Sequence, residues 1–224
     1  MSADDVIALV ESAVAAAEAS LVGPGDWLTG TQRRAAWLEA RDARTNELDR
    51  RRREAISPNA VEGSHVATDE LSAAGVEVMH RIASDPGRLS RTWADKTMAE
   101  IGDTTYTELV GIAATSAVVD TFHWALEGVE PEIGDALPGE PARLRPDTVG
   151  EVGAWVHQTV DVANANVSRS LSLVPETNGW WVGLVNALYS RGPGFFDLMW
   201  ERALSRPQVE LVAARTTAEL ECFY

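Results

Sequence analysis

The stretch from Thr104 to Leu126 constrains the fold of this chain more than any other segment. Its apolar residues recur every three or four positions, so they form a wide stripe along one side of a helix. The members of the stripe are Tyr106, Leu109, Val110, Ala113, Ala117, Val118, Phe122 and Ala125. Gly128 follows at a place where a glycine commonly ends a helix. The pattern predicts a long core helix against which the rest of the chain packs.

Helical signals also dominate the rest of the chain, and no segment alternates strictly between apolar and polar residues as a strand does. Thr29 and Ser90 are suited to cap the helices that follow them. Pro58 stops the first of these helices, because proline disfavours helix in the residue before it. We expect further helices over residues 1–21, from about Gln32 into the arginine run, and over Thr68–Ala83, Arg91–Ile101, Val167–Leu173, Gly179–Tyr189, Phe195–Leu204 and 206–224. The predicted fold class is all-α.

Residues 130–150 differ from both flanks, since they are rich in proline and glycine and have no hydrophobic period. Such a composition indicates a linker or a long surface loop. A chain of 224 residues can form one substantial core or two similar halves. We therefore divide it into a first half (1–129), the linker (130–150) and a second half (151–224).

Composition narrows the functional classes. The net charge of −15 and a pI near 4.6 argue against a general nucleic-acid binder, which needs a basic surface. Residues 1–21 contain acidic residues and no basic ones, which indicates an amphipathic helix and not a signal peptide. No window has the roughly 18 uninterrupted apolar residues of a membrane span. The single cysteine, Cys222, allows no intrachain disulfide and no cysteine zinc cage. We expect a cytoplasmic protein without nucleic-acid or membrane partners.

The four histidines and the acidic residues are the potential metal ligands of the sequence. Glu77 and His80 stand three positions apart on one expected helix, a spacing that can serve a carboxylate-bridged metal site in a helical bundle. Such a site needs ligands on other helices, and His65, His123 and His157 have no repeated partner in the sequence. We therefore interpret His80 as a capping or core-edge histidine, and we expect no metal ion and no cofactor.

The run Arg50 to Arg53 is the one basic cluster of the sequence. It could hold a carboxylate or phosphate ligand through bidentate hydrogen bonds. The flanking acidic residues permit the i, i+4 pairs Glu47–Arg51 and Asp49–Arg53, however. These pairs favour a solvated helix face over a ligand site.

Two stretches of the chain begin alike, residues 28–32 (LTGTQ) and 204–208 (LSRPQ), at an offset of 176 positions (204 minus 28). Two further motifs are Asp85-Pro-Gly-Arg-Leu89 and Tyr106-Thr-Glu-Leu-Val-Gly111. With these motifs, the segments 28–58, 80–89, 106–126 and 170–224 resemble tandem-repeat members of the alkylhydroperoxidase D-like, or carboxymuconolactone decarboxylase, family. The resemblance covers most of the chain apart from the linker. It implies an all-helical fold of two pseudo-repeats and self-association.

The same resemblance implies a redox site written Glu-x11-Cys-x2-Cys-x3-His. Two thiols three positions apart share one face of a helix. One attacks a peroxide as the thiolate and becomes a sulfenic acid, which the other converts to a disulfide. Because a free cysteine has a pKa of about 8.5, a base must assist it at neutral pH. The glutamate and histidine of the pattern serve as that proton relay.

Each half keeps a different part of this pattern. In the second half, Cys222 matches the first cysteine and Glu210 matches the glutamate. In the first half, the matching positions hold residues that cannot do this chemistry. The glutamate position is Arg34, the cysteine positions are Asn46 and Asp49, and the histidine position is Arg53. The first half is therefore interpreted as a degenerate site.

The second cysteine and the histidine of the second half would be positions 225 and 229, after the last residue given, Tyr224. One hypothesis is that a selenocysteine codon at 225 has been read as a stop. A truncated pseudoenzyme and a frameshifted gene are the alternatives. Genomic sequence beyond codon 224 distinguishes them, since the first requires an in-frame UGA followed by a helix that carries a histidine.

The favoured function is a thiol-dependent, peroxidase-like oxidoreductase that reduces alkyl hydroperoxides, with Cys222 as redox thiol and Glu210 as its base or relay. The partners expected are a small hydroperoxide and a thiol reductant. A catalytically inactive relative that acts as a structural or regulatory subunit is the alternative, and a cofactor-free decarboxylase or isomerase is a third possibility on the same scaffold.

The apolar residues of the second half lack the covering helices that the first half has, which predicts exposed patches and a homo-oligomer. These residues are Trp180, Trp181, Leu184, Leu188, Phe195, Phe196 and Trp200.

Overall fold

The computed structural model of the chain describes residues 3–161, 165–189 and 204–220. It confirms the all-α class, and the only strands among these residues are two of two residues each. The α-helices are α1 (Ala3–Val22), α2 (Gly30–Asp42), α3 (Glu47–Glu54), α4 (Ala73–Ser84), α5 (Arg91–Ile101), α6 (Asp103–Glu127), α7 (Asn166–Arg169), α8 (Pro175–Leu188) and α9 (Arg206–Glu219). Two 3-10 turns, η1 (Pro58–Ala60) and η2 (Pro86–Arg88), stand before and after α4.

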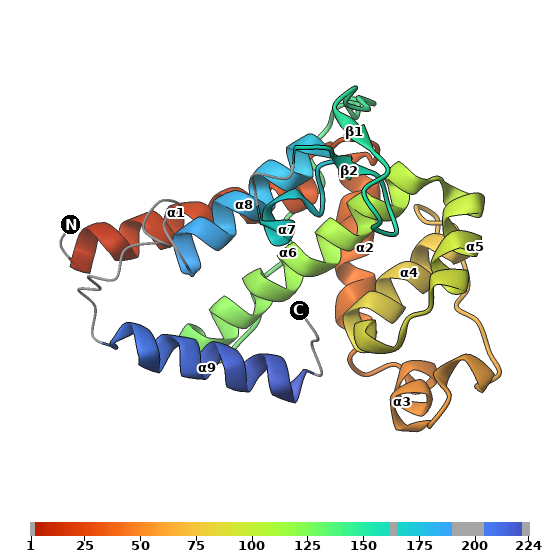
Figure 1. Cartoon of the computed structure of the whole chain (residues 1–224), viewed down its shortest axis with the longest axis horizontal. Helices are drawn as coiled ribbons and strands as arrows, with labels where there is room; N and C mark the ends of the chain where they lie inside the picture. Colours follow the sequence, from red (N-terminus) through yellow and green to blue (C-terminus); the bar gives the residue numbers. More distant parts are fainter. Residues whose placement is uncertain (1–2, 162–164, 190–203, 221–224) are drawn as a thin grey trace.

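The predicted long helix, α6, is the centre of the bundle (Figure 1). It contacts α1, α2, α4, α5 and α8, and α1 and α8 lie side by side along one end. The predicted stripe is buried only in part, since Leu109 and Ala113 are buried whereas Ala117 and Ala125 are exposed. Ile112 and Val119, which the stripe did not include, are fully buried. With Leu109 they join one continuous core with Leu21 of α1, Trp37 of α2 and Met79 of α4. Burial of these apolar residues is what holds the helices together.

By length and hydropathy alone, α6 could also cross a membrane. Its interior, however, carries buried polar residues with protein partners. Glu108 pairs with Arg33, and Asp120 accepts hydrogen bonds from Trp37 Nε1 and Arg41. These features are those of a core helix that packs against other helices.

The local signals at the helix ends are confirmed. The Thr29 hydroxyl accepts a hydrogen bond from the backbone N–H of Gln32. The side-chain oxygen of Gln32 accepts one from the backbone N–H of Thr29, so the two residues form a capping box. Ser90 caps α5 by accepting from the N–H of Trp93. Gly128 ends α6 with φ +73°, in the left-handed region that glycine adopts without strain.

Some predicted boundaries were wrong. The helix expected from Gln32 through the arginines is interrupted at residues 43–46, where Asn46 accepts from the N–H of Leu48 and begins α3. The interruption lets α3 turn and pack on α4. The helix predicted to begin at Thr68 begins at Ala73 after the cap Ser72, and the one predicted over Val167–Leu173 is only the short α7. The helix expected over Phe195–Leu204 lies almost wholly outside the described residues.

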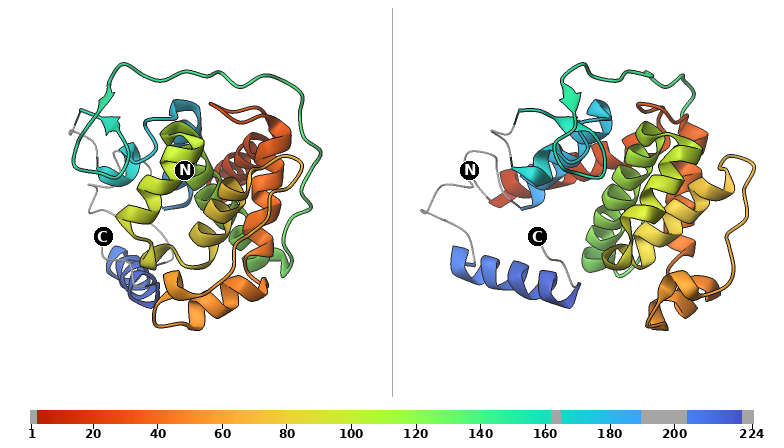
Figure 2. Two further views of the ribbon diagram at one scale, coloured as in Figure 1. Left: turned by 90° about the vertical axis from the view of Figure 1, so that its right-hand side faces the viewer. Right: turned by 45° about the vertical axis from the view of Figure 1, so that its right-hand side comes forward.

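Residues 129–146 form no helix or strand and follow the outside of the bundle as a long arc (Figure 2). The arc is held by backbone bonds, because Leu137 N donates to Val22 O and Arg143 N donates to Asp26 O. It leads to β1 (Val149–Gly150), which pairs antiparallel with β2 (Gln158–Thr159) in a register that sets Val149 opposite Thr159. No alternating pattern in the sequence predicted this short ladder.

The second half is covered better than predicted where it is described. α8 packs against α1 and α6, so Leu184 is buried and the side chains of Trp180, Trp181 and Leu188 are half-buried. The other apolar residues named for this half, at 195, 196 and 200, lie outside the described residues. α9 differs from α8, since none of its residues is buried and Leu211 and Val212 are exposed.

A buried polar group joins α2, α6 and α8 and is called here the Arg33 group: Asp26, Arg33, Glu108 and Thr177. Arg33 Nη1 lies 2.6 Å from Glu108 Oε1, and Arg33 Nε donates to the carbonyl of Ser20. The other Glu108 oxygen accepts from the backbone N–H of Trp27. Asp26 accepts from the backbone N–H groups at the start of α8 and from the Thr177 hydroxyl. Burial raises the pKa of Glu108, and the Arg33 guanidinium opposes that rise.

Candidate functional site

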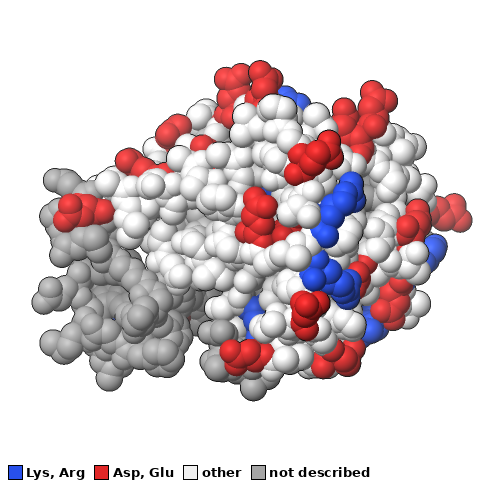
Figure 3. Space-filling view, turned by 90° about the horizontal axis from the view of Figure 1, so that it is seen from above, with Lys and Arg blue, Asp and Glu red and all other residues white. Residues whose placement is uncertain are grey.

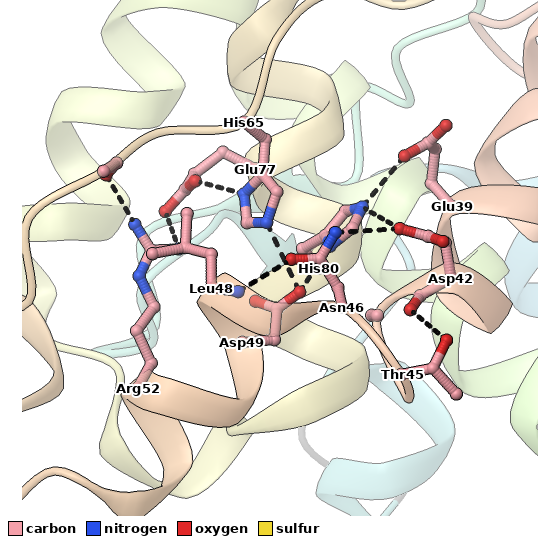
Figure 4. Close-up of polar contacts among 12 residues, drawn as sticks. Glu39, Asp42, Thr45, Asn46, Leu48, Asp49, Arg52, His65, Glu77 and His80 are labelled. Atoms are coloured by element: carbon pink, nitrogen blue, oxygen red, sulfur yellow. Dashed lines mark hydrogen bonds and ion pairs between the residues drawn. The ribbon is translucent and has the colours of Figure 1, made fainter.

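Histidine and carboxylate side chains gather between α2, α3, α4 and the segment that precedes α4 (Figure 4). The group is called here the histidine cluster: Glu39, Asp49, His65, Glu77 and His80. Asp49 projects from α3, Glu39 from α2, and Glu77 and His80 from successive turns of α4. His65 comes from the irregular stretch between η1 and α4. The helix that carries Asp49 is oriented by its Asn46 cap.

The centre of the cluster is buried. Asp49 is 0% exposed, His80 1% and His65 9%. The imidazole rings of His65 and His80 lie face to face, with centroids 3.8 Å apart and planes tilted by 32°. Because both rings present a nitrogen to the same side, Asp49 Oδ2 lies 2.5 Å from His80 Nδ1 and 3.3 Å from His65 Nε2.

The outer nitrogen of each ring faces a glutamate. His65 Nδ1 lies 2.6 Å from Glu77 Oε2, and His80 Nε2 lies 2.9 Å from Glu39 Oε2. Each histidine therefore stands between an outer glutamate and the shared inner aspartate. A glutamate partner of this kind fixes the orientation and the tautomer of an imidazole ring.

Two atoms at the centre have no hydrogen-bond partner. Asp49 Oδ1 and His65 Nε2 are both buried and unpaired, and the geometry of the 3.3 Å approach does not make a hydrogen bond. A buried polar atom without a partner typically costs about 1–3 kcal/mol. An unpaired acceptor next to an unpaired ring nitrogen is a feature that calls for a physical explanation.

The charges within the cluster stabilise one another. Burial opposes ionisation of Asp49, yet the adjacent imidazoles of His65 and His80 hold its pKa well below the usual range. Burial would lower the pKa of His65, but Asp49 and Glu77 raise it to about 9. Against the effect of burial, His65 and Arg52 lower the pKa of Glu77. Arg52 Nη1 lies 2.9 Å from Glu77 Oε1.

A pocket of about 320 Å³ adjoins the cluster. Arg52, His65 and Glu77 line one part of it, and Trp93 and Lys96 of α5 line another. Asp49 and His80 are not part of its lining. His65 and Glu77 thus stand between the pocket and the buried centre.

The structure corrects the interpretation of the arginine run. Arg50 is exposed and pairs with Glu47 and Glu54, as a solvated face would. Asp49 and Arg52, however, are buried toward α4, and Asp49 pairs with histidines instead of Arg53. The helix that carries the arginine run therefore has one solvated face and one buried face, because α3 packs against α4.

The predicted thiol site is described only in part. Cys222 lies outside the described residues. Glu210 is half-buried on α9, where the Tyr189 hydroxyl donates to its Oε2 at 3.0 Å and Arg206 Nε lies 3.3 Å from its Oε1. Tyr189 was not predicted as a site residue, because it follows the end of α8, 21 positions before Glu210.

In the first half, the structure does not bring the residues at the family's relay positions together. Arg34 donates to the carbonyl of Gly134, and Arg53 donates to the carbonyls of Ala43 and Arg44. Only Asp49 among them belongs to the histidine cluster. The interpretation of His80 as a core-edge residue also changes, because it is fully inside and touches Asp49.

Acidic side chains are spread over the face of the molecule seen in Figure 3, with basic ones between them.

Comparison of the chain with protein families, with curated proteins and with solved structures finds no match. The chemistry of the site therefore has to be argued from its own residues.

Proposed function

We propose that the chain is a thiol-dependent, peroxidase-like oxidoreductase of the alkylhydroperoxidase D-like class, in which Cys222 is the redox thiol and Glu210 its base. One observation carries the proposal. At the offset of 176, α2 begins at Gly30 and α9 at Arg206, and each is preceded by a capping box, Thr29 with Gln32 and Ser205 with Gln208. Two helices that begin and are capped alike at this offset support a repeated unit.

The proposed reaction balances with an external dithiol. The Cys222 thiolate attacks the terminal peroxide oxygen, the O–O bond breaks, and the alkoxide leaves as the alcohol after it takes up a proton. Cys222 is then a sulfenic acid, which condenses with one thiol of the reductant and releases water. The second thiol of the reductant displaces Cys222 and forms the reductant's disulfide. The reductant supplies both electrons.

Glu210 is suited to accept the thiol proton. Its carboxylate is oriented by the Tyr189 hydroxyl and by Arg206, and it is only half-buried, so protons can exchange with solvent. A positioned general base typically contributes about 10²–10⁴-fold to a rate.

The test is consumption of an alkyl hydroperoxide with dithiothreitol as reductant. We expect Cys222→Ser to lose the activity and Glu210→Gln to slow it by about 10²-fold or more. Glu219→Gln is a matched control, since Glu219 is an exposed glutamate of the same helix that pairs with Arg215. Equal rates for the wild type and Cys222→Ser would remove the peroxidase proposal.

The alternative, an inactive relative that acts as a structural subunit, is favoured by one observation. Leu211, Val212 and Leu220 of the α9 region are 59–71% exposed, which is unusual for three large apolar residues on one segment. We propose in either case that the chain self-associates through such residues. A strictly monomeric species in sedimentation experiments would contradict this.

A further inference from the structure

The histidine cluster supports an inference that does not depend on Cys222. We propose that Asp49, His65 and His80 form a binding site for a divalent first-row transition metal ion. The geometry of their donor atoms, their burial and their glutamate partners all point to such an ion.

The donor atoms are suitable in type and distance. Two imidazole nitrogens and one carboxylate oxygen lie within 4.8 Å of one another, all on buried residues. An ion bonded to each at about 2.0–2.2 Å fits within that spacing after small side-chain shifts. Two histidines with one carboxylate are a frequent ligand set for zinc and for non-haem iron.

The glutamates occupy the places that support a metal site. Glu77 faces the outer nitrogen of His65, and Glu39 faces the outer nitrogen of His80. A ring that donates its only proton outward keeps a lone pair on the inner nitrogen, where a metal ion binds. Both inner nitrogens point to Asp49.

An ion would also satisfy the unpaired atoms. Asp49 Oδ1 and His65 Nε2 have no hydrogen-bond partner, although both are at least nine-tenths buried by residue. A divalent ion bound between these atoms would be a partner for the unpaired Asp49 oxygen and for the His65 ring nitrogen.

His123 provides a contrast within the same chain. It also lies between two carboxylates, 2.6 Å from Glu18 and 3.4 Å from Glu127. Its side chain is 19% exposed, and no second histidine joins it in a group of possible ligands within the described residues. A histidine with glutamate partners is thus not the distinguishing feature. What distinguishes the cluster is that two inner nitrogens converge on one buried carboxylate.

The ligands come from three different segments, α3, the irregular stretch before α4, and α4 itself. An ion would therefore cross-link the stretch that carries His65 to the two helices. Three protein ligands leave at least one coordination position for a water molecule or a small oxygen ligand.

The experiment is a calorimetric titration of the untagged full-length chain, stripped of metal with a chelator, with Zn²⁺. We expect one equivalent of Zn²⁺ to bind, and His65→Gln to weaken that binding at least 100-fold. Glu77→Gln removes the carboxylate charge that supports His65 and pairs with Arg52, and should weaken the binding by about 10–100-fold. His123→Gln is the matched control and should bind like the wild type.

Two further measurements keep the test decisive if a variant folds poorly. The wild type loaded with Co²⁺ should show ligand-field absorption typical of nitrogen and oxygen ligands, without a thiolate charge-transfer band. Cys222→Ser should bind Zn²⁺ like the wild type, which separates this site from the proposed peroxidase thiol. Absence of stoichiometric binding by the wild type, a thiolate band, or unchanged binding by a folded His65→Gln variant would overturn the proposal.

Discussion

The Arg33 group and the histidine cluster are both buried, charged and built from several elements, but their polar atoms are paired to different degrees. In the Arg33 group, both oxygens of Glu108 and both oxygens of Asp26 accept hydrogen bonds from protein donors. In the histidine cluster, an oxygen of Asp49 and a nitrogen of His65 have no hydrogen-bond partner.

The difference indicates different roles. A fully paired buried group fixes how helices meet and leaves nothing for a ligand to bind. A buried group whose carboxylate oxygen and ring nitrogen are unpaired can still bind a ligand through those atoms. Without the ligand, the unpaired atoms lower the stability of the fold. We therefore interpret the first group as structural and the second as a ligand site.

The largest expected effect tests the structural role of the Arg33 group. Glu108→Leu leaves the Arg33 guanidinium buried without its carboxylate, which should lower the free energy of unfolding by about 3–5 kcal/mol. Urea denaturation measures it. The double variant Arg33→Met with Glu108→Leu should recover most of the loss, because no unpaired charge remains. A loss below about 1 kcal/mol in the single variant would contradict the assignment.

The next effect belongs to the histidine cluster. Zn²⁺ at 100 times its dissociation constant should stabilise the chain by about 2.7 kcal/mol, or raise Tm by about 5–10 °C. Thermal melts with Zn²⁺ and with chelator measure the shift. Glu108→Leu should keep this shift, whereas His65→Gln should lose it. If the shift survives in His65→Gln, the comparison between the two groups fails.

A smaller effect tests how tightly the Arg33 group is packed. A Cβ added at Gly25 would collide with the side chains of Arg33 and Glu108, which their partners hold in place. Gly25→Ala should therefore destabilise the chain by about 1–3 kcal/mol. Gly134→Ala is the control, because nothing lies within 4 Å of the added carbon there. Equal unfolding midpoints for the two variants would show that the group can relax.

The smallest effect is a pH dependence of the metal-free chain. The pKa of His65 is raised to about 9 when folded, against about 6.5 when unfolded, so protonated His65 favours folding. This contribution should be complete below about pH 6.5 and lost as the pH rises through about 9, a change on the order of 1 kcal/mol. The titratable and charged groups around His65 are Asp49, Arg52, Glu77 and His80. Urea denaturation midpoints of the wild type and of His65→Gln, measured in chelator across this pH range, test the contribution. If both proteins show the same dependence of the midpoint on pH, the dependence comes from groups other than His65.

Much of the fold follows from short-range patterns. The long helix α6, the caps Thr29 and Ser90 and the end at Gly128 were predictable, because each depends on residues within four or five positions. The break between α2 and α3 was missed. Asn46 is a good N-cap, yet the helical pattern runs across it, and only packing of α3 on α4 selects the break.

The candidate site was predicted only in fragments. Glu77 and His80 were recognised as a pair with ligand spacing, because a helix brings positions i and i+3 together. Asp49 was assigned to a solvated face, since its i+4 neighbour is an arginine, and His65 lies in a stretch without any period. No local signal joins these two residues to His80.

The sequence by itself determined that the chain is helical, the caps Thr29 and Ser90, and the acidic composition with one cysteine, because these depend on residue type and on neighbours along the chain. Only the tertiary structure decided which charged residues are buried together. Asp49, His65 and His80 are separated by 16 and 15 positions and meet only when α3 folds against α4. Contacts between distant segments depend on how helices pack, and packing is a property of the whole core.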